Sequence, residues 1–183
     1  MMPTLIMFVR HGEKPSEHGA PHGINHHGEQ DAHSLSVRGW MRAGALGALL
    51  AHAPINSHPR IGTPQRILAT KPSPEAKSHR ELDTATPIGR RVDVSVESNF
   101  AHEEEDELCK SILSDPRPTL VVWHHGNLAD LVRRFPITNS QDMPAEWPKD
   151  RFDLIWVLTR GESEGAFTFS TVDQQLLDGD VTS

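Results

Sequence analysis

The stretch TLIMFVRHGEKP, residues 4–15, contains the pattern that decides how this chain folds. Its residues 5–9 form an uninterrupted apolar run, which is typical of a strand covered on both faces of a sheet. Arg10, His11 and Gly12 follow this run directly. A guanidinium and an ionisable imidazole therefore stand where a buried strand leaves the core, and this arrangement predicts a functional site at the end of the strand.

Length and charge limit the classes of protein to consider. The 183 residues fit one domain, 1–183, with a core of its own. The formal net charge of −7, with histidines neutral, argues against a nucleic-acid partner, although a local pocket can still bind an anionic small molecule. The sequence leaves the oligomeric state open.

The expected location is the cytoplasm. The single cysteine, Cys109, cannot form an internal disulfide and is expected in the core, which favours a reducing compartment. No apolar run approaches the roughly 20 residues that span a bilayer, so no membrane partner is expected. The N-terminus lacks a basic region followed by a signal-peptide core.

Segments with strand and helix patterns alternate along the chain. Ser36 is a suitable N-cap for a helix whose apolar stripe includes Trp40, Leu46 and Leu50. This alternation predicts an α/β three-layer sandwich with a mostly parallel central sheet. The expected strands cover residues 5–9, 66–70, 92–96, 119–123, 153–158 and 166–171, and the expected helices cover 37–52, a segment from about 78 that Pro87 interrupts, 103–113 and 128–135.

A second pair of ionisable residues, His124 and His125, follows the apolar strand at 119–123. Ligands of such sheets lie beyond the carboxyl ends of the strands, so these histidines and His11 are expected to meet. Arginine matches the oxygens of a phosphate group, and a histidine can accept a phosphoryl group on a ring nitrogen. A second histidine can stabilise the charge on the transferred group. The pattern indicates phosphoryl chemistry.

The segment VRHGEKP resembles the signature of the histidine phosphatase superfamily, the clan that includes the phosphoglycerate mutases and many small phosphatases. Three further segments are similar to this family in the same order, and the C-terminal part resembles small bacterial members. The resemblance covers nearly the whole chain and implies a phosphoglycerate-mutase-like fold. The three segments are LSVRGWMRAGAL at 35–46, SHRELDTATPI at 78–88 with a second arginine and a Thr-Ala pair, and VVWHHGNL at 121–128 with a histidine before a glycine.

The resemblance also implies roles for individual residues. His11 would be the catalytic nucleophile that becomes phosphohistidine, and Arg10 and Arg80 would bind the phosphoryl oxygens. His125 would be the second histidine of the pocket, because the family's histidine directly precedes the glycine. His124 is then expected to point elsewhere and to support the pocket or pack. Water would release inorganic phosphate, and no metal ion or other cofactor is implied.

The sequence departs from the family pattern in two places. Mutases and sugar bisphosphatases usually carry an asparagine shortly after the signature, whereas this chain has KPSEHG at 14–19, which weakens a mutase interpretation. Those members also have a glutamate that protonates the leaving group. Glu97 and the acidic run 103–105 lie in the corresponding region, and we select Glu103 as the residue most exposed on the loop side. A solvated helix N-terminus is the alternative interpretation of this run.

The favoured function is a metal-independent phosphatase that acts on a phosphomonoester or a phosphohistidine. Its partner would be a phosphorylated small molecule or a phosphoprotein, selected by the loops at 18–33 and 136–150. One alternative is a catalytically inactive member that binds a phosphorylated ligand or partner. Another is a histidine-rich metal-binding module, since many of the 12 histidines lie between 18 and 33. His18 and His22 have helical spacing, but Gly19 and Pro21 disfavour a helix there, so no metal site is assigned.

Overall fold

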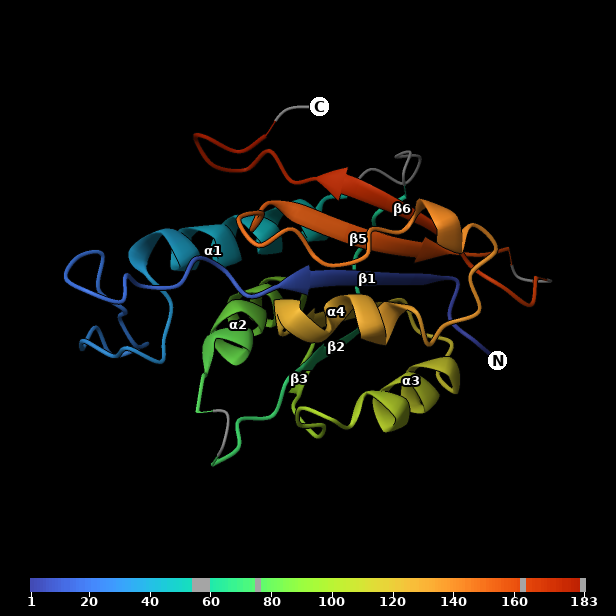
Figure 1. Ribbon diagram of the computed structural model, residues 1–183, viewed down its shortest axis with the longest axis horizontal. Coiled ribbons are helices and arrows are strands. Elements are labelled where there is room, and N and C mark those ends of the chain that lie inside the picture. The colour runs from blue at the N-terminus through green and yellow to red at the C-terminus, as the bar shows by residue number, and fades with distance from the viewer. Residues whose placement is uncertain (54–59, 75–76, 162–163, 182–183) are drawn as a thin grey trace.

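The computed structural model describes residues 1–53, 60–74, 77–161 and 164–181. These residues form a six-stranded sheet with four α-helices and one short 3₁₀ helix (Figure 1). The strands are β1 (Leu5–Arg10), β2 (Arg66–Ala69), β3 (Val96–Glu97), β4 (Thr119–Trp123), β5 (Leu154–Thr159) and β6 (Thr168–Asp173). The helices are α1 (Val37–Ala51), α2 (Arg80–Val92), α3 (Glu105–Leu113) and α4 (His125–Val132), and the 3₁₀ helix is η1 (Ser140–Asp142).

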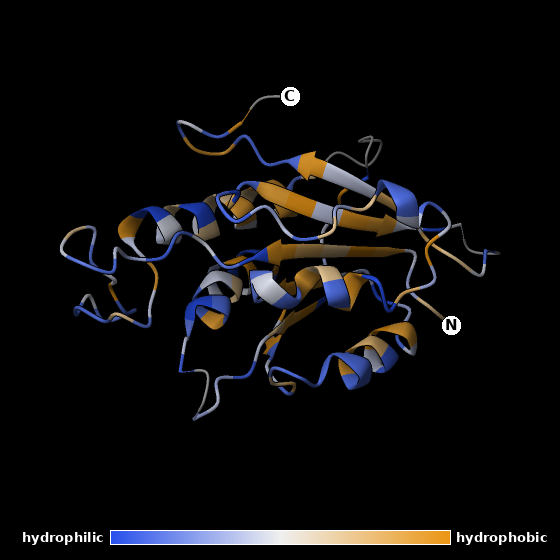
Figure 2. Cartoon of the chain, viewed as in Figure 1, coloured by the Kyte–Doolittle hydropathy of each residue, from blue (hydrophilic) through white to orange (hydrophobic). Residues whose placement is uncertain are grey.

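The sheet has the strand order β3-β2-β4-β1-β5-β6. β3, β2, β4 and β1 pair in parallel, whereas β5 is antiparallel to both β1 and β6. Only β5 therefore runs against the other strands, and the expectation of a mostly parallel sheet is confirmed. Every residue of β1 and β4 is buried, which explains the uninterrupted apolar runs at 5–9 and 120–123 in these central strands. Figure 2 shows the run of β1 in orange.

The sheet is covered on both faces, as the predicted three-layer sandwich requires. Leu5, Met7 and Val9 of β1 belong to a core cluster with residues of α1 and α2. Ile6 and Phe8, which alternate with them, belong to a second cluster with residues of α3 and α4. Successive side chains of a strand point to opposite faces, so the two clusters lie on opposite sides of the sheet. Both faces of β1 are thus buried, each in its own cluster of apolar side chains.

The first helix agrees with the sequence expectation. The Ser36 hydroxyl accepts a hydrogen bond from the Gly39 amide at 3.2 Å, which caps the N-terminus of α1. Its buried face includes Leu46 and Leu50, and it ends at Ala51. None of the helices in the described ranges is both long and apolar enough to cross a membrane.

The expected interruption at Pro87 is wrong, because α2 continues through this residue to Val92. A proline inside a helix costs about 3 kcal/mol relative to alanine. Tertiary packing opposes this cost, since Ala85 and Ile88 of the same helix are fully buried against the sheet. α1 also packs closely on α2, where a Cβ on Gly47 would lie only 3.3 Å from the Ile88 Cα. The buried face therefore keeps α2 continuous.

Several other boundaries differ from the predicted ones. The strand expected at 92–96 is reduced to β3, because α2 runs on to Val92 and ends where Asp93 adopts a left-handed conformation with φ 57°. α3 begins two residues later than expected, at Glu105, and α4 begins three residues earlier, at His125. β5 and β6 form the expected pair, displaced by one or two residues.

The signature segment and α1 approach each other with almost no space between their backbones. A Cβ on Gly12 would lie 2.7 Å from the Gly39 carbonyl oxygen, and a Cβ on Gly39 would lie 2.5 Å from the Glu13 carbonyl oxygen. The Ser36 amide donates to the same Glu13 carbonyl at 3.0 Å. Both glycines are therefore required for close packing.

Two glycines of α1 provide a matched test of this close approach. Gly39→Ala should lower the free energy of unfolding by about 2 kcal/mol, because the added methyl group collides with backbone. Gly44→Ala adds the same methyl group to the same helix with no neighbour within 4 Å, and should raise it by about 0.5–1 kcal/mol through helix propensity. Urea unfolding of both variants measures the difference. Equal effects at the two positions would contradict the packing argument.

Candidate active site

The candidate nucleophile lies at the carboxyl edge of the parallel strands. β1 and β4 are neighbours in the sheet, with Arg10 opposite Trp123 in the register. His11 and His124, the residues that follow, therefore leave the sheet at the same edge. Figure 1 shows the segment between β1 and α1 projecting beyond this edge. Arg10 and His11 are both 3% exposed, so the site begins inside the protein.

The hydrogen bond of His11 determines which ring nitrogen can react. Its Nδ1 lies 2.7 Å from the Gly12 carbonyl oxygen, which can only accept, so Nδ1 carries the proton. The lone pair of the neutral ring is then on Nε2. Burial, and next the charges of Arg10 and Arg80, lower the pKa of His11 from 6.5 to about 3, against the effect of the Gly12 carbonyl. His11 is therefore neutral near pH 7.

The two histidines after β4 form the N-terminus of α4. The Nδ1 of His124 accepts a hydrogen bond from the Gly126 amide at 3.3 Å, so His124 caps the helix and the alternation of the strand ends there. His125 follows in the first turn. Its ring centroid lies 6.3 Å from that of His11, with the rings nearly perpendicular at 83°. Burial, and then the charge of Arg10, lower the pKa of His125 to about 4.

Arg10 points its guanidinium toward the segment that precedes β5. Its Nη1 donates a hydrogen bond to the Lys149 carbonyl, and its Cζ lies 3.8 Å from the centroid of the Phe152 ring. Burial lowers the pKa of Arg10 to about 10, which keeps it cationic near pH 7. Among the described residues, its buried Nε has no hydrogen-bond partner. A charged donor is thus left for an anion.

Arg80 stands at the first position of α2. Its Nε donates to the Ser34 carbonyl at 3.2 Å and its Nη2 to the Ala32 carbonyl at 2.7 Å. Burial is the main cause of the lowered pKa of His11 and of His124, and the charge of Arg80 lowers both further. Arg80 therefore adds to the positive potential that acts on the two histidines.

The Thr-Ala pair of α2 holds the signature segment in place. The Thr84 hydroxyl accepts a hydrogen bond from the Gly12 amide at 2.8 Å and donates one to the Arg80 carbonyl at 2.7 Å. One buried hydroxyl thus joins the residue after the candidate nucleophile to the helix that carries the second arginine. This bridge is the physical reason for a threonine four residues after Arg80.

Glu103 lies in the loop before α3, outside the helix in which it was expected. Its φ of 74° is unusual for a residue other than glycine, and such strain is often found at functional sites. The other candidates are engaged: Glu97 pairs with Arg66 at 2.9 Å, Glu104 accepts from a backbone amide at 2.7 Å, and buried Glu105 accepts from an indole of β4 at 3.2 Å. Of these four candidates, Glu103 is the exposed carboxylate for which the described residues supply no such partner.

Three residues near this edge were not selected from the sequence. The His102 ring lies 4.9 Å from that of His124, so the loop that carries Glu103 contacts the histidine pair. Thr70 follows β2, and its buried Oγ1 has no partner among the described residues. Phe152 contacts both Arg10 and the His11 ring, the latter at 6.1 Å between centroids. Only His102 could have been suspected, from its position beside Glu103.

Three buried polar side-chain atoms without a hydrogen-bond partner among the described residues lie at the carboxyl ends of neighbouring strands. Arg10 Nε, His125 Nδ1 and Thr70 Oγ1 have no described hydrogen-bond partner, and they follow or end the adjacent strands β1, β4 and β2. Buried polar groups are almost always paired, so their grouping indicates a ligand site. Two of these three atoms belong to Arg10 and His125, for which the sequence analysis predicts a role in phosphate binding.

The histidine-rich segment is arranged differently. His26 and His27 stack on each other at 3.8 Å between centroids, and the Nδ1 of His22 contacts the Gln30 amide at 3.3 Å. In the described ranges, no three or more His, Cys, Asp or Glu side chains are grouped so as to hold a metal ion.

Comparison with known proteins identifies the fold. No family model and no curated protein matches the sequence. The structure is similar to the crystal structure of the "putative phosphohistidine phosphatase SixA from Agrobacterium tumefaciens", with a TM-score of 0.54 and 15% sequence identity. The similarity covers 94% of this chain and 98% of that one. The expected fold of the phosphoglycerate-mutase-like type is thereby confirmed, while the chemistry has to be argued from the site.

The lowered pKa of His11 makes stability depend on pH. Between about pH 6.5 and pH 3, the unfolded chain binds a proton at this residue that the folded protein does not, so stability is lost as the pH falls. His11 alone should reduce the free energy of unfolding by about 2 kcal/mol between pH 7 and pH 5. Urea unfolding at a series of pH values measures this slope, which His11→Asn should flatten. An unchanged slope in the variant would contradict a buried neutral His11.

Proposed function

We propose that this protein is a phosphatase that hydrolyses a phosphomonoester or a phosphohistidine through a covalent phosphohistidine at His11, without a metal ion. The observation that carries the proposal is the state of His11, a buried neutral imidazole whose Nε2 lone pair is free because Nδ1 donates to Gly12. A neutral imidazole is a competent nucleophile, and a protonated one is not. Arg10, Arg80 and His125 surround it with charge and hydrogen-bond donors.

In the first step, with a phosphomonoester as substrate, Nε2 of His11 attacks phosphorus and forms a P–N bond while the P–O bond to the leaving group breaks. The electron pair remains on the departing oxygen, which takes a proton from Glu103 acting as general acid. With a phosphohistidine, the bond that breaks is the P–N bond of the substrate, and the departing imidazole nitrogen keeps the electron pair. The unpartnered Nε of Arg10 and the guanidinium of Arg80 bind the phosphoryl oxygens, and His125 adds a further contact. The two arginines supply the positive charge that a metal ion provides in other phosphotransfer enzymes.

In the second step, water attacks the phosphorus of the phosphohistidine. The P–N bond breaks, its electron pair returns to Nε2 of His11, and inorganic phosphate leaves. Glu103, a carboxylate after the first step, accepts the proton of the attacking water and is ready for the next cycle. The Gly12 carbonyl holds the same proton on Nδ1 throughout, so the ring does not need to reorient.

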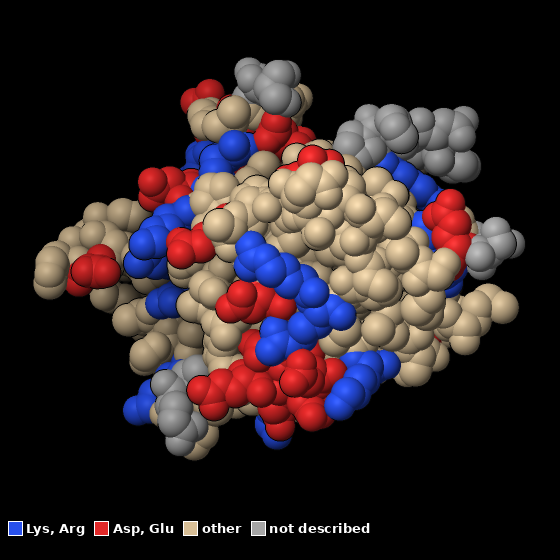
Figure 3. Space-filling view, turned by 45° about the vertical axis from the view of Figure 1, so that its right-hand side comes forward, with Lys and Arg blue, Asp and Glu red and all other residues tan. Residues whose placement is uncertain are grey.

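Two observations bear on the substrate. The face drawn in Figure 3 has Lys and Arg side chains next to Asp and Glu rather than a continuous basic surface, which favours a small molecule or a phosphoprotein over nucleic acid. The structural neighbour bears the description "putative phosphohistidine phosphatase", which supports a phosphohistidine among the substrates to be tested.

A second candidate is an inactive protein that binds a phosphorylated ligand. It is favoured by the position of Glu103, since no described contact joins this exposed carboxylate to the arginines or to His11, and an alcohol leaving group needs an acid. Such a protein would bind oxyanions without turning over a phosphate ester.

Hydrolysis of p-nitrophenyl phosphate in the presence of a chelator separates the two candidates. The wild-type protein should turn over this substrate and be inhibited by orthovanadate, which mimics the transferred phosphoryl group. His11→Ala should lose at least about a thousandfold in kcat, because the covalent step is removed. His52→Ala, a histidine at the end of α1, is the control and should remain active. Vanadate binding without turnover would favour the inactive protein.

A comparison of leaving groups tests the role of Glu103. Glu103→Gln should slow hydrolysis of an alkyl phosphate by about 100-fold or more, because its leaving oxygen needs a proton. It should alter kcat for p-nitrophenyl phosphate only a few-fold, because that leaving group departs as an anion. Glu107→Gln removes another exposed carboxylate of the acidic run and serves as the control. Equal effects of Glu103→Gln on both substrates would exclude a general acid at this position.

A further inference from the structure

Phe152 gives the buried guanidinium of Arg10 an aromatic face. The Arg10 Cζ lies 3.8 Å from the ring centroid, well within the range of a cation–π interaction. The Lys149 carbonyl accepts from Nη1 of the same guanidinium. The ring and the carbonyl together restrain Arg10, while its Nε keeps no partner among the described residues. This arrangement leaves one buried donor of Arg10 for an anion.

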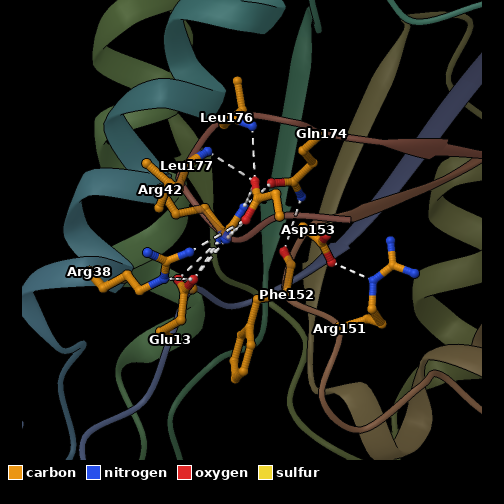
Figure 4. Close-up of polar contacts among 12 residues, drawn as sticks. Glu13, Arg38, Arg42, Arg151, Phe152, Asp153, Gln174, Leu176 and Leu177 are labelled. Carbon is orange, nitrogen blue, oxygen red and sulfur yellow. Dashed lines mark hydrogen bonds and ion pairs between the residues drawn. The ribbon is translucent and has the colours of Figure 1, made fainter. Parts of the chain in front are cut away.

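The backbone of Phe152 is held by the segment that follows β6. Gln174, which is 5% exposed, donates through Nε2 to the Phe152 carbonyl at 3.2 Å and to the Leu154 carbonyl at 2.9 Å. Asp153 accepts from the Val181 amide at 2.8 Å. Figure 4 shows these contacts, with the Phe152 ring pointing away from them. The C-terminal segment thus holds the Phe152 carbonyl and the two residues that follow it, Asp153 and Leu154.

Arg42 joins this segment to the signature residues. It is 2% exposed, and its guanidinium contacts Glu13 at 2.8 Å, Asp180 at 2.6 Å and the Gln174 oxygen at 2.9 Å (Figure 4). Burial opposes the charged form, but the hydrogen bonds with Asp180 and Glu13 raise the pKa of Arg42. Glu13 lies two residues after His11. One buried cation is therefore bonded on one side to the signature segment and on the other to the C-terminal segment.

Asp180 determines the shape of the C-terminal segment. Its carboxylate accepts hydrogen bonds from the Leu176 amide at 2.9 Å and the Leu177 amide at 3.0 Å, in addition to its ion pair with Arg42. The pKa of Asp180 is lowered, because these bonds outweigh the burial that would raise it. The turn at 176–180 is thus closed around an ionised carboxylate.

We propose that Phe152 is a positioning residue of the phosphoryl site, which holds Arg10 through its ring and is itself held by the C-terminal segment through Gln174, Arg42 and Asp180. The inference deepens the proposed function, on which it rests, by adding residues outside the segment VRHGEKP that carries Arg10 and His11. Its chemistry is specific: the ring must offer a π face to Arg10, and apolar bulk alone does not suffice.

Two substitutions at Phe152 separate the π face from apolar volume. Phe152→Leu keeps an apolar side chain but removes the ring, and should weaken orthovanadate binding about tenfold. Phe152→Tyr keeps the ring and should bind vanadate within about threefold of the wild type. Isothermal titration with orthovanadate and competitive inhibition of p-nitrophenyl phosphate hydrolysis measure these affinities. Equal affinity of the two variants would overturn the role of the ring.

Substitutions at Asp180 and Gln174, with Asp178 as the control, test the role of the C-terminal segment. Asp180→Asn removes the charge that faces Arg42 and should weaken vanadate binding several-fold, whereas Asp178→Asn makes the same charge change at an exposed position of the same segment and should not. Gln174→Met leaves the Arg42–Asp180 pair intact, removes the bond to the Phe152 carbonyl, and should behave like Asp180→Asn. Wild-type affinity in Gln174→Met would overturn the role of the segment.

Failure of this proposal and failure of the proposed function give different results. Vanadate titration does not require turnover, so a protein that hydrolyses nothing can still show the expected order of affinities at Phe152. In that case the phosphatase assignment fails and the positioning role stands. If the wild-type protein hydrolyses the substrate but Phe152→Leu and Phe152→Tyr bind vanadate equally well, the phosphatase assignment stands and the positioning role of Phe152 fails.

Discussion

The parallel pairing of β1 with β4 is the constraint on which the candidate site depends. Both strands are buried on both faces, so neither can shift its register without exposing apolar side chains. With Arg10 opposite Trp123, the residues that follow each strand must leave the sheet together. The distance between the rings of His11 and His125 is thus a consequence of strand pairing. No local interaction between the two rings is needed to bring them there.

Burial gives this edge its chemistry. A histidine near 3% exposure and close to two guanidinium groups cannot easily hold a proton, and the lowered pKa of His11 follows. Its hydrogen bond to the Gly12 carbonyl then places the lone pair on the other nitrogen. Close backbone packing of Gly12 on Gly39 keeps that bond in place. The fold thus produces a neutral imidazole among cations, which is the combination that the proposed function uses.

Much of the fold and of the candidate site could be predicted from the sequence, because the signals depend on residues that are neighbours along the chain. Uninterrupted apolar runs indicated β1 and β4, Ser36 indicated the start of α1, and both histidine segments were expected at strand ends. The interruption predicted at Pro87 was wrong, because the sequence shows the cost of a proline inside a helix but not the burial of Ile88, which outweighs that cost. The roles assigned to Arg10, Arg80, His125 and Glu103 remain predictions, although the structure places the His125 ring near that of His11.

The sequence by itself determined which segments are strands and helices and where Arg10 and His11 stand, since those properties depend on neighbouring residues. The tertiary structure alone decided what surrounds them. Phe152 lies 142 residues from Arg10, and Asp180 lies 138 residues from Arg42. No periodicity or motif connects such pairs. They meet because β1 and β5 are adjacent strands and the segment after β6 packs against α1, which are contacts that exist only once the chain has folded.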